Sequence, residues 1–336
     1  MKVSVLGAGT WGTALTILLA ENKHDVTIWS ALPKEVEELD KNRTAIKNLP
    51  GAVLPESVHV TADLAEALKE PEMLVMAVAS VYVRETARRI SLNIPEGMII
   101  VNVAKGIEEA TLKTLTEVIE DEIPQAEVAV LSGPSHAEEV SRKIPTTIVA
   151  GAKKKQVADK IQDAFMNEFF RVYTSPDVIG IELGGSLKNV IALAAGVLDG
   201  FGLGDNTKAA LMTRGIAEIS RLGMAMGGKY ETFAGLSGMG DLMVTCTSKH
   251  SRNRNAGVLI GQGKTAAEAM KEVNQTVEGV YSAKAAYKLG QKYNIELPIV
   301  EQVNKVLFED KSVKEAIVEL LIRQKTEEHS TLSWEQ

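Results

Sequence analysis

Lys2-Val3-Ser4-Val5-Leu6-Gly7-Ala8-Gly9-Thr10-Trp11-Gly12 opens the chain, and this stretch decides the fold. Its first five residues predict a strand, its glycines follow the G-x-G-x-x-G spacing, and an apolar stripe over 14–19 predicts a helix directly afterwards. Gly7 permits the tight turn, Gly9 leaves room for a pyrophosphate, and Gly12 lets the helix pack close to the strand. The N–H groups and the dipole of a helix N-terminus attract phosphate. The stretch therefore predicts a dinucleotide site, against the alternative of a fortuitous tight turn.

Short apolar strands alternate with helical patterns through the first half of the chain. Strands are expected over 2–6, 25–29, 58–61, 73–78, 98–103, 128–131 and 147–150, with a last edge strand at 171–173. Helices are expected between them, for instance over 63–68 and 111–121. This alternation predicts an α/β fold with a Rossmann-type, mostly parallel sheet covered by helices on both faces.

After Pro176 the strand patterns end and long helical patterns replace them. They cover 183–198, 208–226, 265–273, 279–293, 299–308 and 313–323. We therefore expect a dinucleotide-binding Rossmann domain over 1–180, an all-helical domain that binds substrate over 181–326, and a polar tail over 327–336. Ligands of such proteins bind at the carboxyl edge of the sheet, so the site should lie between the two domains.

Composition excludes several classes of protein. A net charge of -7 gives no general attraction for nucleic acid or an anionic membrane. The longest apolar stretches, such as 190–198, are shorter than the roughly 20 residues that span a bilayer, so no membrane insertion is expected. No secretory signal is expected, because no basic and apolar stretch with a cleavage site is visible before the first strand. Cys246 is the single cysteine, so no internal disulfide can form and a reducing cytoplasm is expected. We expect Cys246 to be a small buried residue rather than a nucleophile.

Lys188 is the strongest catalytic candidate, because it is the only charged residue from Leu183 to Leu198. Its helical neighbours three and four positions away include no carboxylate that could pair with it. Partial desolvation would lower the pKa of such an amine toward the range of a general acid or base. The alternative is a lysine that reaches solvent from a packed helix.

Two further candidates follow predicted strands. Lys105 stands just past the strand that ends at 103, where ligands bind in such sheets; the alternative is a surface loop lysine. Gly133 and Ser135 lie in the turn after the next strand, where N–H groups and a hydroxyl would suit an oxygen-rich substrate. The alternative for Ser135 is a structural helix cap. His136 could act as a base, but the sequence assigns it no partner.

Two loops of the second half add polar groups. A glycine-rich loop over 235–242 would bring Asp241 into the cleft to orient an ammonium, unless Asp241 only caps a helix. Ser251, Arg252 and Asn253 lie in a stretch with many donors and few acceptors, which suits a phosphate; a solvated basic loop is the alternative. No cluster of cysteine and histidine indicates a metal site.

Together these segments resemble the bacterial NAD(P)-dependent glycerol-3-phosphate dehydrogenases over roughly residues 3 to 325. The motifs that carry the resemblance occur in the order of the family: 7–14, 104–106, 131–137, 182–189, 238–242 and 250–253. The resemblance implies interconversion of sn-glycerol 3-phosphate and dihydroxyacetone phosphate with NAD(P)H and no metal, in the cytoplasm, feeding phospholipid synthesis. A homodimer is plausible because the helical domain has apolar faces to spare.

The resemblance also implies roles for individual residues. Lys188 matches the proton donor and acceptor of the family. The matching substrate positions are Lys105, Gly133, Ser135, Lys188, Asp241, Ser251, Arg252 and Asn253. The matching coenzyme positions, besides the fingerprint Gly7, Gly9 and Gly12, are Thr10, Trp11, Lys105, Ala137, Arg252, Val277 and Glu278.

The chain departs from the usual coenzyme pattern at one place. An acid that binds the ribose 2′-OH is expected some 20 residues beyond the glycines, but Ser30 stands there and Ala31-Leu32 follow. Many relatives carry basic residues there that suit the 2′-phosphate of NADP, and Lys34 could take their place. The sequence therefore leaves the choice between NAD and NADP open, and the family resemblance slightly favours NADPH.

Two alternative functions stay open at this point. One is another two-domain hydroxy-acid dehydrogenase, related to the 6-phosphogluconate or 3-hydroxyisobutyrate enzymes. The other is a non-catalytic redox sensor that binds NAD(P)H.

Overall fold

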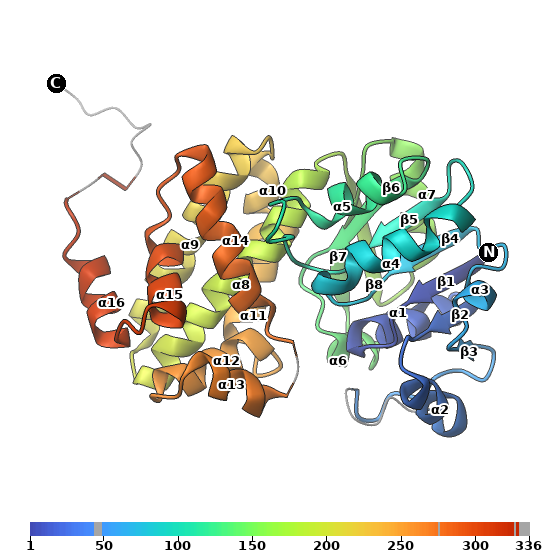
Figure 1. Ribbon diagram of the computed structural model, residues 1–336, viewed down its shortest axis with the longest axis horizontal. Helices are drawn as coiled ribbons and strands as arrows, with labels where there is room; N and C mark the ends of the chain where they lie inside the picture. The colour runs from blue at the N-terminus through green and yellow to red at the C-terminus, as the bar shows by residue number, and fades with distance from the viewer. Residues whose placement is uncertain (44–48, 275, 326, 329–336) are drawn as a thin grey trace.

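The computed structural model describes residues 1–43, 49–274, 276–325 and 327–328. It has two parts that lie side by side, a sheet with helices and a bundle of helices (Figure 1). This arrangement confirms the expected fold class. The expected polar tail at 327–336 lies almost wholly outside the described residues.

Eight strands form one sheet in the order β3-β2-β1-β4-β5-β6-β7-β8. All neighbours pair parallel except β6 and β7, which pair antiparallel. The strands agree with the expected ones to within a few residues at their ends, including the edge strand β8. Their bounds are β1 Lys2–Leu6, β2 Asp25–Trp29, β3 His59–Thr61, β4 Met73–Met76, β5 Ile99–Asn102, β6 Glu127–Ser132, β7 Thr146–Ala152 and β8 Phe170–Ser175.

Helices cover both faces of this sheet because the strands are apolar on both sides. One face packs against α1, α2, α6 and α7, and the other packs against α3, α4 and α5. The bounds are α1 Thr10–Glu21, α2 Pro33–Asn42, α3 Leu64–Ala67, α4 Val83–Ile90, α5 Leu115–Glu122, α6 Ala137–Val140 and α7 Lys155–Phe165. The chain order reverses between β1 and β4, so the loops after these two strands flank the crevice where ligands of such sheets bind.

The second part of the molecule consists of helices packed around α8. Every residue of α8 from Gly180 to Leu198 is buried. The bounds are α8 Val178–Phe201, α9 Asp205–Ala225, α10 Tyr230–Ala234, α11 Asp241–Thr247, α12 Arg252–Gly261, α13 Ala266–Val273, α14 Glu278–Tyr293, α15 Pro298–Phe308 and α16 Val313–Leu321. Each long helix expected after Pro176 is present.

Helix α8 is the long apolar helix of the molecule. At 24 residues it is long and apolar enough to cross a membrane by length and composition alone. Its uninterrupted apolar stretches are nevertheless short, because Glu182, Lys188 and Asp199 divide it. Within the protein, however, 94% of its most apolar window is buried. That burial is the pattern of a core helix.

The helix expected over 111–121 begins later, at Leu115. Thr114 and Glu117 form a capping box, in which each side chain bonds the backbone of the other residue. Leu112 has a positive φ of 60°, which no α-helix accommodates. The cap therefore fixes the start of α5 and leaves the preceding residues as a loop.

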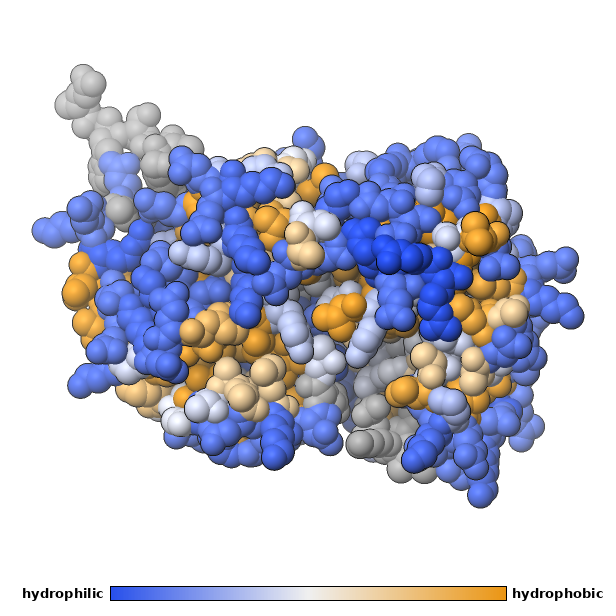
Figure 2. Space-filling model, in the orientation of Figure 1, coloured by the Kyte–Doolittle hydropathy of each residue, from blue (hydrophilic) through white to orange (hydrophobic). Residues whose placement is uncertain are grey.

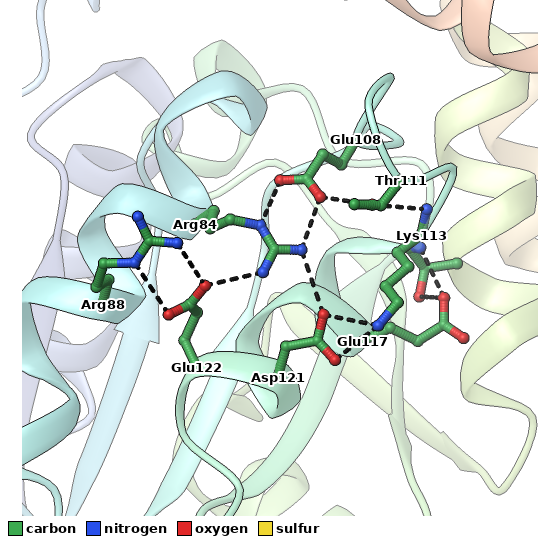
Figure 3. Close-up of polar contacts among 9 residues, drawn as sticks. Arg84, Arg88, Glu108, Thr111, Lys113, Glu117, Asp121 and Glu122 are labelled. Atoms are coloured by element: carbon green, nitrogen blue, oxygen red, sulfur yellow. Dashed lines mark hydrogen bonds and ion pairs between the residues drawn. The ribbon is translucent and has the colours of Figure 1, made fainter.

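An ion-pair network fixes that loop, which leads on from Lys105. Arg84 of α4 donates to Glu108 of the loop (2.6 Å) and to Glu122 of α5 (2.9 Å), and contacts Asp121 at 3.3 Å (Figure 3). The guanidinium of Arg84 holds the pKa of Glu108 below its usual range. Figure 2 shows that the most hydrophilic surface of this face lies over α4. The network thus ties the loop after β5 to two helices of the sheet.

Helices α8 and α12 pack backbone against backbone. Each contributes two glycines four residues apart, Gly196 and Gly200 from α8 and Gly257 and Gly261 from α12. A Cβ added at Gly257 would lie 2.0 Å from the carbonyl oxygen of Leu193. The start of α12, with Arg252 and Asn253, is therefore placed by direct contact with α8, the helix that carries Lys188.

We predict that Gly257→Ala lowers the free energy of unfolding by about 1–3 kcal/mol, because the added methyl must push the two helices apart. Urea denaturation at pH 7 measures this loss. Gly204→Ala is the control, since nothing lies within 4 Å of its added Cβ. Equal losses in the two variants would contradict the close contact.

Candidate functional site

The glycine-rich turn after β1 has the geometry that its sequence predicts. Gly7 has a φ of 120°, and an added Cβ would lie 2.7 Å from the carbonyl carbon of Ala77, which follows β4. A Cβ at Gly12 would lie 2.0 Å from the carbonyl oxygen of Gly7. The two glycines therefore allow the turn and the close approach of α1 to the sheet.

The N-terminus of α1 fits a dinucleotide phosphate. Its N-cap residue Gly9 supplies no side-chain cap, and nothing lies within 4 Å of the position that a Cβ would occupy there. The helix N-terminus thus has no side-chain cap, and the space beside Gly9 is open to an anion that its first N–H groups would attract. Thr10 and Trp11 begin the helix, and the buried Nε1 of Trp11 has no hydrogen-bond partner among the described residues.

The centre of the site is the carboxylate of Asp241, which pairs with two lysines. Its Oδ1 accepts from Lys188 Nζ at 2.5 Å and its Oδ2 accepts from Lys105 Nζ at 2.6 Å. Lys105 Nζ also donates to the carbonyl oxygen of Gly133 at 3.1 Å. Lys188 and Asp241 are buried, whereas the side chain of Lys105 is 20% exposed. Residues from the ends of β5 and β6 thus meet two helices of the bundle at one carboxylate.

Burial is the main influence on the Lys188 amine. The pKa of Lys188 is lowered to about 7: burial lowers it most, the charge of Asp241 raises it, and the charge of Lys105 lowers it. The amine can therefore hold or release a proton near neutral pH. We expected this desolvation from the sequence, because Lys188 is the only charged residue among apolar neighbours.

Thr245 also binds the amine, and the sequence analysis missed it. Its Oγ1 accepts from Lys188 Nζ at 2.6 Å and donates to the carbonyl oxygen of Asp241 at 2.6 Å, one turn earlier in α11. Thr245 and Asp241 are four residues apart, so they share a face of α11. That spacing was the available signal, but it is too common in helices to single out this residue.

The segment before Asp241 is helical and not the expected loop. Residues Leu236–Gly240 form a π-helical turn that continues into α11, whose first residue is Asp241. Glycine lets this turn approach α8, because a Cβ at Gly184 would lie 2.5 Å from the carbonyl oxygen of Ser237. The small residues of α8 thereby bring Asp241 to Lys188.

The turn after β6 does not support the alternative for Ser135, a structural helix cap. His136, not Ser135, occupies the N-cap position of α6, and Ser135 Oγ donates to the carbonyl oxygen of Gly133 at 3.0 Å. Ala137 is the first residue of α6 and is buried. Burial, together with the charges of the two lysines, lowers the pKa of His136 to about 4. His136 is therefore neutral at pH 7.

The stretch at 250–255 is the start of a helix and not a loop. Ser251 is the N-cap of α12, and its Oγ accepts from the N–H of Arg254. Asn253 Nδ2 donates to Asn189 Oδ1 at 2.9 Å, and its Oδ1 accepts from Gly279 N at 2.8 Å, which leaves one amide N–H. Arg252 is exposed. A loop was expected because the stretch has no apolar period. The expectation was wrong because Ser251 caps a helix that begins with polar residues.

Glu278, the first residue of α14, reaches across to the sheet. Its Oε2 accepts from the hydroxyl of Ser80 at 2.6 Å, in the segment after β4, and burial raises its pKa. Val277 precedes it as the buried N-cap residue. These two residues thus lie beside the crevice between β1 and β4.

Glu182 of α8 is a second residue that the sequence analysis did not single out. It accepts from Asn102 Nδ2 (3.2 Å) at the end of β5, and from the backbone N–H (3.0 Å) and hydroxyl of Thr116 in α5. Burial raises its pKa to about 7. This carboxylate joins the helix that carries Lys188 to the sheet. Its partners are distant in the sequence, so the sequence alone could not assign them.

Two other expectations concern Cys246 and metals. The thiol of Cys246 is buried, and burial raises its pKa to about 12, which fits a packed residue rather than a nucleophile. No group of three or more His, Cys, Asp or Glu side chains in the described part of the chain could hold a metal ion.

Comparisons with known proteins agree with the resemblance drawn from the motifs. The sequence model of the N-terminus of NAD-dependent glycerol-3-phosphate dehydrogenase matches residues 2–158, and the model of its C-terminus matches 177–318. A glycerol-3-phosphate dehydrogenase [NAD(P)+] from Agathobacter rectalis is 60% identical over 333 residues, which are 99% of each chain. One from Fusobacterium nucleatum is 58% identical over 97% of this chain and 98% of its own.

Solved structures give the same result. A crystal structure of glycerol-3-phosphate dehydrogenase from Coxiella burnetii is 38% identical, with a TM-score of 0.93 over 96% of this chain and 99% of its own. D-mandelate dehydrogenase in a ternary structure is 11% identical, with a TM-score of 0.63 over 96% of this chain and 100% of its own. That likeness extends to the fold alone.

We predict that Thr245→Val lowers the free energy of unfolding at pH 7 by about 1–3 kcal/mol, because it removes an acceptor from a buried ammonium. Thr247→Val is the matched control. The Thr247 hydroxyl bonds the carbonyl oxygen of Met243 in the same way, at 2.8 Å, but it is exposed. Its loss should stay below about 0.5 kcal/mol. Similar urea denaturation midpoints for the two variants would contradict the contact with Lys188.

Proposed function

Because the chain belongs to the NAD-dependent glycerol-3-phosphate dehydrogenase family, we propose that it interconverts sn-glycerol 3-phosphate and dihydroxyacetone phosphate with NAD(P)(H). The observation that carries this function is the Lys188–Asp241–Lys105 cluster, in which Lys188 and Asp241 are buried. A carbonyl that gains a hydride develops negative charge on its oxygen. A buried ammonium stabilises that charge more strongly than water does.

In this proposal Lys188 is the proton donor and acceptor. Its ammonium gives a proton to the alkoxide oxygen as the ketone is reduced, and its neutral amine takes the proton from the hydroxyl in the reverse direction. Asp241 and Thr245 accept hydrogen bonds from Nζ and so orient its remaining N–H. General acid catalysis of this kind contributes typically ~10²–10⁴-fold.

The phosphate of the substrate is assigned to the start of α12. Arg252 is exposed there and offers two parallel N–H donors, and Asn253 has one amide N–H left. Both lie at a helix N-terminus, whose dipole favours an anion. Ser251, Ser135, Gly133 and Lys105 complete the proposed set of substrate residues.

The coenzyme is assigned to the crevice between β1 and β4. When bound, the nicotinamide supplies or accepts the hydride. The residues proposed to hold it are Gly7, Gly9, Thr10, Trp11, Gly12, Lys105, Ala137, Arg252, Val277 and Glu278. The open space at Gly9 and the uncapped helix N-terminus support the diphosphate position.

The alternative functions have less support. The family membership favours a three-carbon phosphate over the hydroxy acids of other two-domain dehydrogenases. A redox sensor that only binds NAD(P)H would have no use for a buried lysine held by a carboxylate, since burying both charges is costly.

The wider setting is part of the same proposal. We place the division between the nucleotide and substrate domains near residue 180, with 1–180 and 181–326 as the two domains. We propose a cytoplasmic homodimeric enzyme without membrane insertion that supplies glycerol 3-phosphate for phospholipid synthesis.

The test is an absorbance assay of NADH and NADPH oxidation with dihydroxyacetone phosphate. We expect turnover with the phosphate ester and a large loss with unphosphorylated dihydroxyacetone, because binding of the remote phosphate helps to orient the carbonyl. Lys188→Ala should abolish turnover while the reduced coenzyme still binds. No oxidation with any three-carbon phosphate would overturn the function. More than a tenth of the wild-type rate in Lys188→Ala would remove Lys188 from its role.

A further inference from the structure

The adenosine ribose is the part of the coenzyme that distinguishes NAD from NADP. In Rossmann folds an acid after β2 accepts from the ribose 2′-OH of NAD, whereas a cation is needed for the 2′-phosphate of NADP. In this chain the residue after β2 is Ser30, which has no charge. The question is which charged group the structure brings to this place.

Glu35 reaches back to the end of β2 from the first turn of α2. Ser30 is buried, and its hydroxyl donates to Glu35 Oε2 and accepts from the N–H of Leu32 at 3.1 Å. Pro33 occupies the first turn of α2 and restricts the chain there. No described residue donates a hydrogen bond to Glu35 Oε1. The carboxylate is therefore fixed beside the strand end with one oxygen available.

The other charged residues near the end of β2 are also mostly acidic. Residues 30–40 contain four carboxylates and one cation, Lys34, which is exposed. Arg43 donates to the carbonyl oxygen of Val58 and to Asp40. Arg89 stacks on the ring of Trp29, 5.6 Å from its centroid, on the opposite face of the sheet from α2. In the described part of the chain, Arg43 is thus already paired, and Arg89 lies against Trp29 on the other face of the sheet.

We propose that Glu35, held by Ser30, accepts a hydrogen bond from the ribose 2′-OH and makes this protein selective for NAD(H) over NADP(H). A 2′-phosphate would bring up to two negative charges next to this carboxylate and its acidic surroundings. The inference rests on the nicotinamide coenzyme of the proposed function, but not on the identity of the substrate.

The test measures coenzyme binding without substrate. Dissociation constants for NADH and NADPH come from nicotinamide fluorescence, and those for 5′-AMP and adenosine 2′,5′-bisphosphate come from calorimetry. We expect the wild-type protein to bind NADH at least about tenfold more tightly than NADPH, the size of one charge-assisted hydrogen bond. Glu35→Gln keeps an acceptor but removes the charge, so it should tighten NADPH about fivefold or more and change NADH much less.

Glu38→Gln is the matched control, because it removes an exposed carboxylate from the same helix. It should leave the ratio of the two dissociation constants nearly unchanged. Equal or tighter binding of NADPH by the wild-type protein, or an equal shift in Glu38→Gln, would overturn the inference. Binding of neither coenzyme would contradict the proposed function itself, whereas failure of the substrate assay alone would leave this measurement intact.

Discussion

One carboxylate shared by two lysines is the interaction on which the site depends. Asp241 offers one oxygen to Lys188 and the other to Lys105, and its side chain is 1% exposed. A buried lysine without such a partner would lose its charge or destabilise the fold. With it, the amine keeps a pKa near neutrality. The ion pair with Asp241 therefore allows the buried Lys188 amine to be protonated, so that it could stabilise the negative oxygen of the proposed reaction.

The rest of the fold brings this carboxylate and these amines together. Glycine contacts place α12 and the turn before α11 directly on α8, so that Asp241 and Arg252 lie close to the helix of Lys188. Glu182 joins that helix to the end of β5, and Lys105 follows the same strand. Glycine contacts thus hold the helices of the bundle on α8, and the buried Glu182 joins α8 to the sheet. The site lies where the bundle and the sheet meet.

The sequence predicts the fold well because its signals are local. The glycine turn, the alternating strands and the apolar helices each follow from neighbouring residues. Lys188 stood out for the same reason, as one charge in an apolar helix. Thr245, Glu182 and Glu35 did not, because their roles depend on partners that only the folded chain brings close. The helix at 236–240 was missed because the segment is short and rich in glycine, and the helix at 252–261 was missed because polar residues begin it without an apolar period.

The most direct measurement is the pH dependence of kcat/KM for dihydroxyacetone phosphate reduction at saturating NADH, between pH 5.5 and 9. Reduction needs the Lys188 ammonium, which is present below its pKa of about 7. The rate should therefore be level at low pH and fall about tenfold per unit well above pH 7, while glycerol 3-phosphate oxidation rises over the same range. A reduction rate that stays constant up to pH 9 would contradict a proton held by this amine.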